Sequence, residues 1–193
     1  MKQILIVESS PRGSESASRK LTGKVRARLE ARYSEATIIE RDLAKNKVPH
    51  LGEPAVKAIS TKDSAEAESL QEALRLSDQL IEELLSSDLL VIASPMWNFG
   101  IPSSLKAWID HVVRAGKTFN YVGAGVEGLA KGKKAILVLA SGGVFSEGPW
   151  KPWDVPIRHN HSLAGQGSTL VRQTSIVFRF NMDAHWAGVN PVV

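Results

Sequence analysis

The chain has 193 residues, of which 43% are hydrophobic and 23% charged, a balance that excludes a disordered or fibrous protein. We predict a single cytoplasmic domain over residues 1–193 with no membrane partner, because no apolar run is long enough to span a bilayer. The absence of cysteine excludes disulfides, thiolate metal sites and cysteine nucleophiles. The net charge is +4, but no basic run is interleaved with aromatic residues, so no nucleic acid partner is predicted.

Strand and helix patterns alternate along the first 140 residues. Strand-length apolar segments lie at 4–7, 36–39, 89–93 and 135–140. Helical periodicity of apolar residues lies between them, at 17–29, 70–84 and 105–113. Three of the strand segments are apolar throughout, which is typical of strands covered on both faces. The alternation therefore predicts a doubly wound parallel sheet with helices on both faces.

The last helix of this series, 105–113, and the residue that follows it carry three polar side chains that are candidates for a functional role. We expect His111 to be a packed or surface histidine and not a proton donor. Asp110 and Arg114 are four residues apart, so we expect them to form a surface ion pair. None of these residues is predicted to act in catalysis.

The composition changes after residue 148. This tail has no glutamate, contains three of the five tryptophans, and is interrupted by proline and glycine. Only 174–180 has a clear strand pattern, which would be the fifth strand of the sheet, and no later helix is predicted to cover it. His159 and His161 lack a carboxylate or third ligand at useful spacing, so we predict no metal site.

Ligands bind at the carboxyl ends of the strands in open parallel sheets, which draws attention to the loop at 8–18. This loop holds five serines and leads into a helix. Short hydroxyl donors and the first amides of a helix can together surround a phosphate. Capping the helix is the alternative role, but a cap needs only one serine. We therefore favour a phosphate site, although the loop has neither a Walker sequence nor a dinucleotide glycine motif.

Two further strand ends carry unusual loops. Residues 94–102 place two aromatic side chains and a methionine between prolines, which suits a planar ligand; a hydrophobic plug over the sheet is the alternative. Ser141, Gly142 and Gly143 leave backbone open to a flat ring, although Gly-Gly is also an ordinary turn. A phosphate pocket beside a ring platform predicts a bound mononucleotide, and the fold suits FMN.

These motifs resemble those of the FMN-dependent NADH:quinone and azo-compound reductases of the flavodoxin-like superfamily. The resemblance covers roughly 2–153. It rests on Ser10, Ser16, Ser18, the motif at 95–99, and the segments 105–110, 114–119 and 128–135. It implies a flavodoxin-like sheet of five strands, with an atypical C-terminal part at 154–193.

The resemblance also implies site residues. The FMN phosphate would be held by Ser10, Ser16 and Ser18. The isoalloxazine ring would be contacted by Pro95, Met96, Trp97, Asn98 and Phe99. The pyrimidine edge of the ring would be lined by Ala140, Ser141, Gly142 and Gly143, where the family often has Ser-Arg-Gly-Gly. A substrate cavity near a dimer interface would include Phe119 and Tyr121, for which ordinary apolar packing is the alternative.

The function implied is electron transfer from NADH to quinones and azo compounds through bound FMN, by a ping-pong mechanism in a homodimer. No catalytic side chain is expected, because the flavin carries the chemistry. One alternative is a flavodoxin-like electron carrier or flavin-binding module without small-molecule turnover. Another is an inactive homologue, since the pattern of 154–193 departs from the family. A change of reading frame, or a sequencing error, near Trp153 would produce that departure, and resequencing the gene across this codon tests it.

Overall fold

The computed structural model describes residues 2–61, 71–123, 125–143, 148–153 and 175–181. His159 and His161 lie outside the described residues. The strands are β1 (Gln3–Glu8), β2 (Thr37–Asp42), β3 (Leu89–Pro95), β4 (Phe119–Val122), β5 (Gly125–Gly128), β6 (Lys134–Ser141) and β7 (Ser175–Asn181). The helices are α1 (Ala17–Arg32), α2 (Glu53–Ser60), α4 (Gln71–Ser86), α5 (Ser103–Val112) and the 3₁₀ helix η1 (Gly148–Trp153). None of the helices in these ranges is long and apolar enough to cross a membrane.

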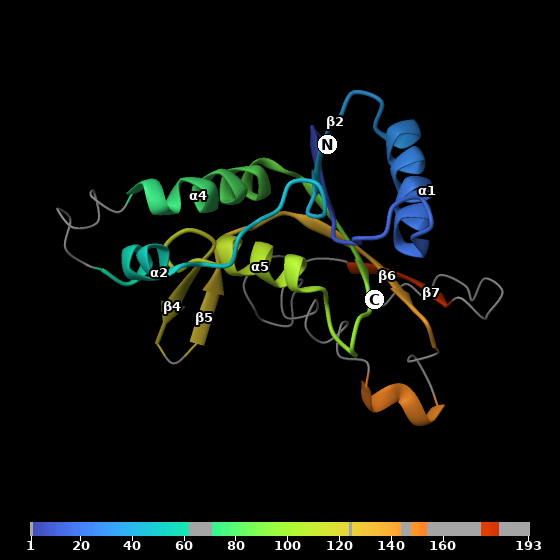
Figure 1. Cartoon of the computed structure of the whole chain (residues 1–193). Helices are drawn as coiled ribbons and strands as arrows, with labels where there is room; N and C mark the ends of the chain where they lie inside the picture. Colours follow the sequence, from blue (N-terminus) through green and yellow to red (C-terminus); the bar gives the residue numbers. More distant parts are fainter. Residues whose placement is uncertain (1, 62–70, 124, 144–147, 154–174, 182–193) are drawn as a thin grey trace.

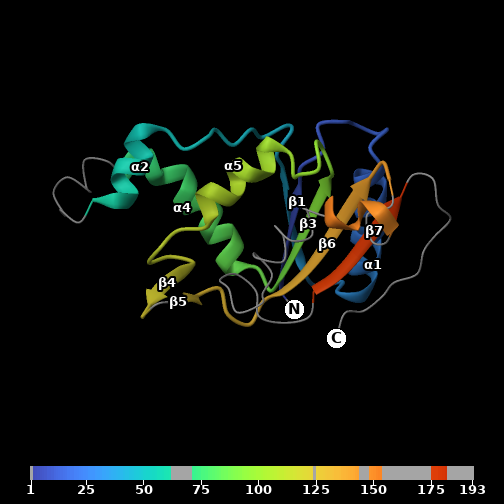
Figure 2. The ribbon, with the colours of Figure 1, turned by 90° about the horizontal axis from the view of Figure 1, so that it is seen from below.

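Five strands form one parallel sheet in the order β2-β1-β3-β6-β7 (Figure 2). Helix α1 covers one face of the sheet, and α4 and α5 cover the other (Figure 1). The chain first adds β2 on one side of β1 and then β3 on the other. The loops that leave β1 and β3 therefore diverge at one end of the sheet, which is where doubly wound folds bind their ligands. The predicted fold class, a doubly wound parallel sheet with helices on both faces, is confirmed.

Alternating residues of the central strands fill two apolar cores. Leu5, Val7 and Ile92 face α4 and α5, whereas Ile4 and Val91 face α1. Both sets are fully or almost fully buried, which explains why these strands are apolar throughout. Each buried aliphatic side chain contributes about 1.5–3 kcal/mol to folding. The cores therefore hold the strand ends, and the loops attached to them, on a rigid base.

The polar residues at the end of α5 do not pair as expected. The helix ends at Val112, so Asp110 and Arg114 are not one helical turn apart, and Asp110 pairs with Lys106 instead. Arg114 is buried and donates from Nη1 to Asp78 Oδ1 on α4, at 2.8 Å. The predicted surface pair is thus wrong. His111 is buried with Nε2 2.9 Å from the Pro49 carbonyl oxygen, so a packed histidine is confirmed.

The hairpin of β4 and β5 is an element that the apolar pattern did not predict. Its two short antiparallel strands pair with each other and not with the main sheet (Figure 1). It precedes β6 along the chain and lies toward the end of the sheet opposite the loops that follow β1 and β3 (Figure 2). Three of its apolar side chains, Tyr121, Val122 and Val126, are solvent-exposed, whereas Phe119 is half-buried.

Candidate functional site

The three serines of the first loop converge at the start of α1. Ser16 Oγ donates to Ser10 Oγ at 2.8 Å and lies 3.0 Å from Ser18 Oγ, and all three side chains are buried. Ser16 is also the N-cap, accepting the Arg19 amide at 3.3 Å. Capping thus accounts for one serine, while the other two hydroxyls are bonded within the cluster. Three hydroxyls at a helix start are a set of donors that an oxyanion can recruit.

An ion pair that the sequence analysis missed fixes this serine loop. Arg19 donates from Nη1 to Asp42 Oδ2 at 2.8 Å and from Nη2 to Asp42 Oδ1 at 2.9 Å. The same guanidinium donates to the carbonyl oxygens of Ser10, at 2.6 Å, and Arg12, at 2.8 Å. It therefore ties the loop after β1 to the end of β2. The sequence held one signal of this ion pair, an arginine in the first turn of a helix, where its charge opposes the helix dipole.

The carboxylate of Asp42 is held in its charged form. The hydrogen bond from Arg19 lowers the pKa of Asp42 to about 2, with a further contribution from the Ala44 amide. The side chain is only 5% exposed, so solvent screens the pair weakly. We call the Arg19–Asp42 pair and its carbonyl contacts the arginine clamp.

The pH dependence of stability should report on the arginine clamp. The pKa of Asp42 is depressed in the folded state, so its contribution is present above pH 4 and is lost as pH falls toward about 2. We expect the stability advantage of the wild type over Asp42→Asn to shrink by about 1 kcal/mol between pH 5 and pH 3. Urea denaturation of both proteins at several pH values measures this. A constant difference would contradict the depressed pKa.

Glu8 is a second acidic residue beside the serines, at the end of β1. It is buried, and its Oε1 accepts the Ser10 amide at 3.1 Å. Burial raises the pKa of Glu8, because an apolar environment disfavours the charged form. Glu8 thus holds the amide of Ser10, and Arg19 holds its carbonyl oxygen.

The loop after β3 makes a tight turn that exposes its aromatic rings. Trp97 and Gly100 exchange backbone hydrogen bonds at 3.0 and 2.8 Å, and Asn98 and Phe99 have φ values of 47° and 59°. Two successive positive φ angles define a type I′ turn, which is costly for phenylalanine and is retained mostly at functional sites. Trp97 is 47% and Phe99 41% exposed. The rings are therefore not a plug buried over the sheet.

The loop after β6 lies beside this turn. Pro95 and Ala140 are register partners, and the Met96 amide donates to the Ala140 carbonyl oxygen at 2.7 Å. Ser141 Oγ donates to the Gly143 carbonyl oxygen at 2.8 Å. A Cβ atom added to Gly142 would meet nothing within 4 Å, so the protein's own packing does not require glycine there. The two loops predicted to contact a flat ring are thus adjacent.

The remaining predicted residues are not at this end of the sheet. Phe119 and Tyr121 lie on β4, with their ring centroids 5.3 Å apart in an edge-to-face contact. Tyr121 is 74% exposed, which argues against ordinary packing beneath a loop. Within one chain, the hairpin is separated from the serine cluster and the turn (Figure 2).

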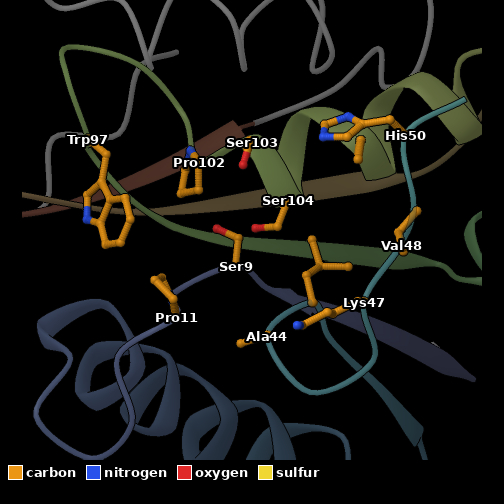
Figure 3. Close-up of a pocket in the computed structure, with 12 residues that line it drawn as sticks. Ser9, Pro11, Ala44, Lys47, Val48, His50, Trp97, Pro102, Ser103 and Ser104 are labelled. Atoms are coloured by element: carbon orange, nitrogen blue, oxygen red, sulfur yellow. The ribbon is translucent and has the colours of Figure 1, made fainter.

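A cavity of about 370 Å³ opens next to the turn, between the ends of β1 and β2 and the start of α5. Its walls come from the loop after β1, the segment at 43–50, and residues at 97–107 (Figure 3). Sequence reasoning missed this cavity, because its lining residues are ordinary loop and helix-start residues that only the fold brings together.

Comparisons with known proteins identify the family to which this fold belongs. Residues 2–168 match the family described as having a flavodoxin-like fold. A solved azoreductase from Bacillus anthracis superposes with a TM-score of 0.78 at 28% identity, covering 93% of this chain and 87% of that one. The fold and the three loops therefore define a flavodoxin-like protein.

Two curated relatives identify the family more specifically. An FMN-dependent NADH:quinone oxidoreductase of Beijerinckia indica is 64% identical over 154 residues, which are 80% of this chain and 76% of the relative. One of the same name from Agrobacterium fabrum is 45% identical over 77% of this chain and 73% of the relative. The chain belongs to this oxidoreductase family, as its motifs predicted, and is an enzyme.

Proposed function

We propose that this enzyme transfers electrons from NADH to quinones and azo compounds, cleaving the azo bond reductively. Its relatives' names supply the donor, the acceptors and the FMN requirement. The observation that carries the proposal is the buried serine cluster beside two adjacent loops that offer exposed rings and open backbone. The serine cluster matches a phosphate, and the two loops match a flat ring.

The residues present fit FMN. Ser10, Ser16 and Ser18 would exchange their mutual hydrogen bonds for bonds to the phosphate, helped by the dipole of α1. The segments 95–99 and 140–143 would hold the ring between them. Bound FMN supplies the electron-transfer chemistry. Amides of Asn98, Gly142 and Gly143 would stabilise negative charge at the pyrimidine edge of the ring, so no acid–base side chain is needed.

In the proposed ping-pong cycle one flat site receives both substrates in turn. NADH binds first, and the acceptor binds after the oxidised dinucleotide has left. Initial rates at several NADH and quinone concentrations should give parallel double-reciprocal lines. Intersecting lines would contradict the ping-pong order. A purified, FMN-loaded protein that does not oxidise NADH would favour the electron-carrier alternative.

We further propose a homodimer in which the hairpin serves the partner's site. The exposed apolar residues Tyr121, Val122 and Val126 lie together on β4 and β5. Apolar side chains at this exposure are typical of interaction surfaces. Phe119 and Tyr121 are far from the flavin loops of their own chain, and a second copy would bring them to a substrate cavity.

A charged substitution on the hairpin tests the proposed homodimer. Tyr121→Asp places a carboxylate where the proposed interface buries apolar surface, so we expect the variant to sediment as a monomer with a higher KM for quinone. Lys131→Gln, an exposed substitution just beyond the hairpin, is the control and should remain dimeric. A wild-type protein that sediments as a monomer would contradict the proposal.

A further inference from the structure

The cavity beside Trp97 has the chemistry of an oxyanion site. Its lining contains one ammonium group, Lys47, and the imidazole of His50, but no carboxylate. Three hydroxyls also line it, those of Ser9, Ser103 and Ser104. Figure 3 shows Trp97 and Pro11 on one side, Lys47 and Val48 on the other, and Ser103 and Ser104 between them. The remaining walls are mostly apolar. Such a mixture of apolar walls with a few converging polar groups is typical of ligand pockets.

The Ser9 hydroxyl of the cavity donates to the Ala93 carbonyl oxygen at 2.8 Å, whereas the other polar side chains of the lining have no such partner in the part of the chain that the structure describes. Among the described residues, Lys47 has no ion pair, although Lys45 two positions earlier pairs with Asp42 at 3.5 Å. Within the same part of the chain, the hydroxyls of Ser103 and Ser104 make no hydrogen bond. An unpaired cation with two free hydroxyls favours an anion over a neutral ligand.

The first turn of α5 adds donors to the same wall. Pro102 is the N-cap and offers no side-chain hydrogen bond, and the first turn holds no acidic residue. The Pro102 carbonyl oxygen accepts the amides of Leu105 and Lys106, which leaves the Ser103 and Ser104 amides outside this pairing. These amides are among those that a helix cannot satisfy internally. An anion in the cavity would therefore meet backbone donors as well as Lys47.

The position of the cavity connects it to the electron donor. Trp97 belongs both to the turn that would contact the flavin ring and to the cavity wall. A dinucleotide whose nicotinamide lies on the ring must place its diphosphate to one side of the ring. The volume, about 370 Å³, is at the small end of ligand pockets and suits part of such a molecule.

We infer that this cavity binds the diphosphate of the nicotinamide donor, with Lys47 as the principal cation. The inference rests on the proposed function. The serine cluster at α1 would hold the cofactor phosphate, and the cavity at α5 would hold the donor phosphates. The two phosphate sites thus lie on different helices, at neighbouring strand ends.

Stopped-flow kinetics on the FMN-loaded protein separate the two half-reactions. In Lys47→Gln we expect the apparent Kd for NADH in the reductive half-reaction to rise about tenfold, the effect of losing one cation–phosphate contact. The limiting rate of flavin reduction and the oxidative half-reaction with an uncharged benzoquinone should not change. Lys47→Arg should restore most of the affinity. Lys106→Gln, which removes one positive charge from the outer side of α5, is the matched control.

Other outcomes would overturn the inference. An unchanged Kd for NADH in Lys47→Gln would show that the cavity does not bind the donor. A change confined to the oxidative half-reaction would assign it to the acceptor, and dissociation of a dimer would assign it to an interface. Failure of the proposed function is distinguishable, because the wild type would then not retain FMN or would not be reduced by NADH.

Discussion

Replacing Gly142 with valine should abolish FMN retention while leaving the protein folded. The Cβ direction at Gly142 is open for 4 Å, and its φ is not in the left-handed region, so the protein itself tolerates a side chain. The branched side chain would instead occupy the space in which the flavin ring lies against the backbone. We expect affinity for FMN to fall by about 100-fold or more, which corresponds to about 2.7 kcal/mol.

Fluorescence titration of FMN with thermal unfolding of the apoprotein tests this expectation. Gly23→Val is the matched control, because a Cβ at this glycine of α1 also meets nothing within 4 Å. Both variants should unfold close to the wild type, apart from a modest gain where valine replaces glycine in the helix, and only Gly142→Val should lose FMN. Full occupancy in Gly142→Val would contradict the placement of the ring beside 140–143.

Breaking the arginine clamp should have the second large effect. Arg19→Met leaves the buried Asp42 carboxylate without its principal partner and releases the carbonyl oxygens of Ser10 and Arg12. Removing one member of a buried pair commonly costs about 3–5 kcal/mol, and Arg19 is partly exposed, so we expect about 3 kcal/mol of lost stability. FMN affinity should fall as well, because the serine loop loses its anchor.

The matched control for the clamp is Arg26→Met on the same helix. Arg26 pairs with Glu30 and Glu40, but all three side chains are more than a third exposed. Exposed pairs contribute about 1 kcal/mol or less, so this variant should keep both stability and FMN. If Arg19→Met and Arg26→Met behaved alike in urea denaturation and FMN titration, the clamp would have no special role.

The sequence predicted the sheet well because burial on both faces leaves a simple pattern. The strands at 4–7 and 89–93 are apolar throughout and lie at the centre of the sheet. The predicted strand at 36–39, which forms an edge of the sheet, was too short, because β2 continues through Glu40, Arg41 and Asp42. Charged residues at an edge strand pair with neighbouring helices, as Arg41 does with Glu83, and such tertiary partners are invisible to a periodicity.

The candidate site likewise has a part that could be predicted from the sequence and a part that could not. The three loops were predictable, since their residue types are unusual and strand ends are where ligands bind. Arg19 and Lys47 were not, because an arginine on a helix and a lysine in a loop have many ordinary explanations. The role of Arg19 comes from Asp42, with which the fold pairs it, and the role proposed for Lys47 comes from the cavity that it lines together with the hydroxyls of α5.

The central claim is that these loops hold FMN and pass electrons from NADH to a quinone. The most direct test is the visible absorption spectrum of protein that has been incubated with FMN, desalted, and then treated anaerobically with NADH. We predict flavin bands that survive desalting, bleach with NADH and return when quinone is added. Protein that emerges from desalting without flavin, or whose flavin does not respond to NADH, would contradict the claim.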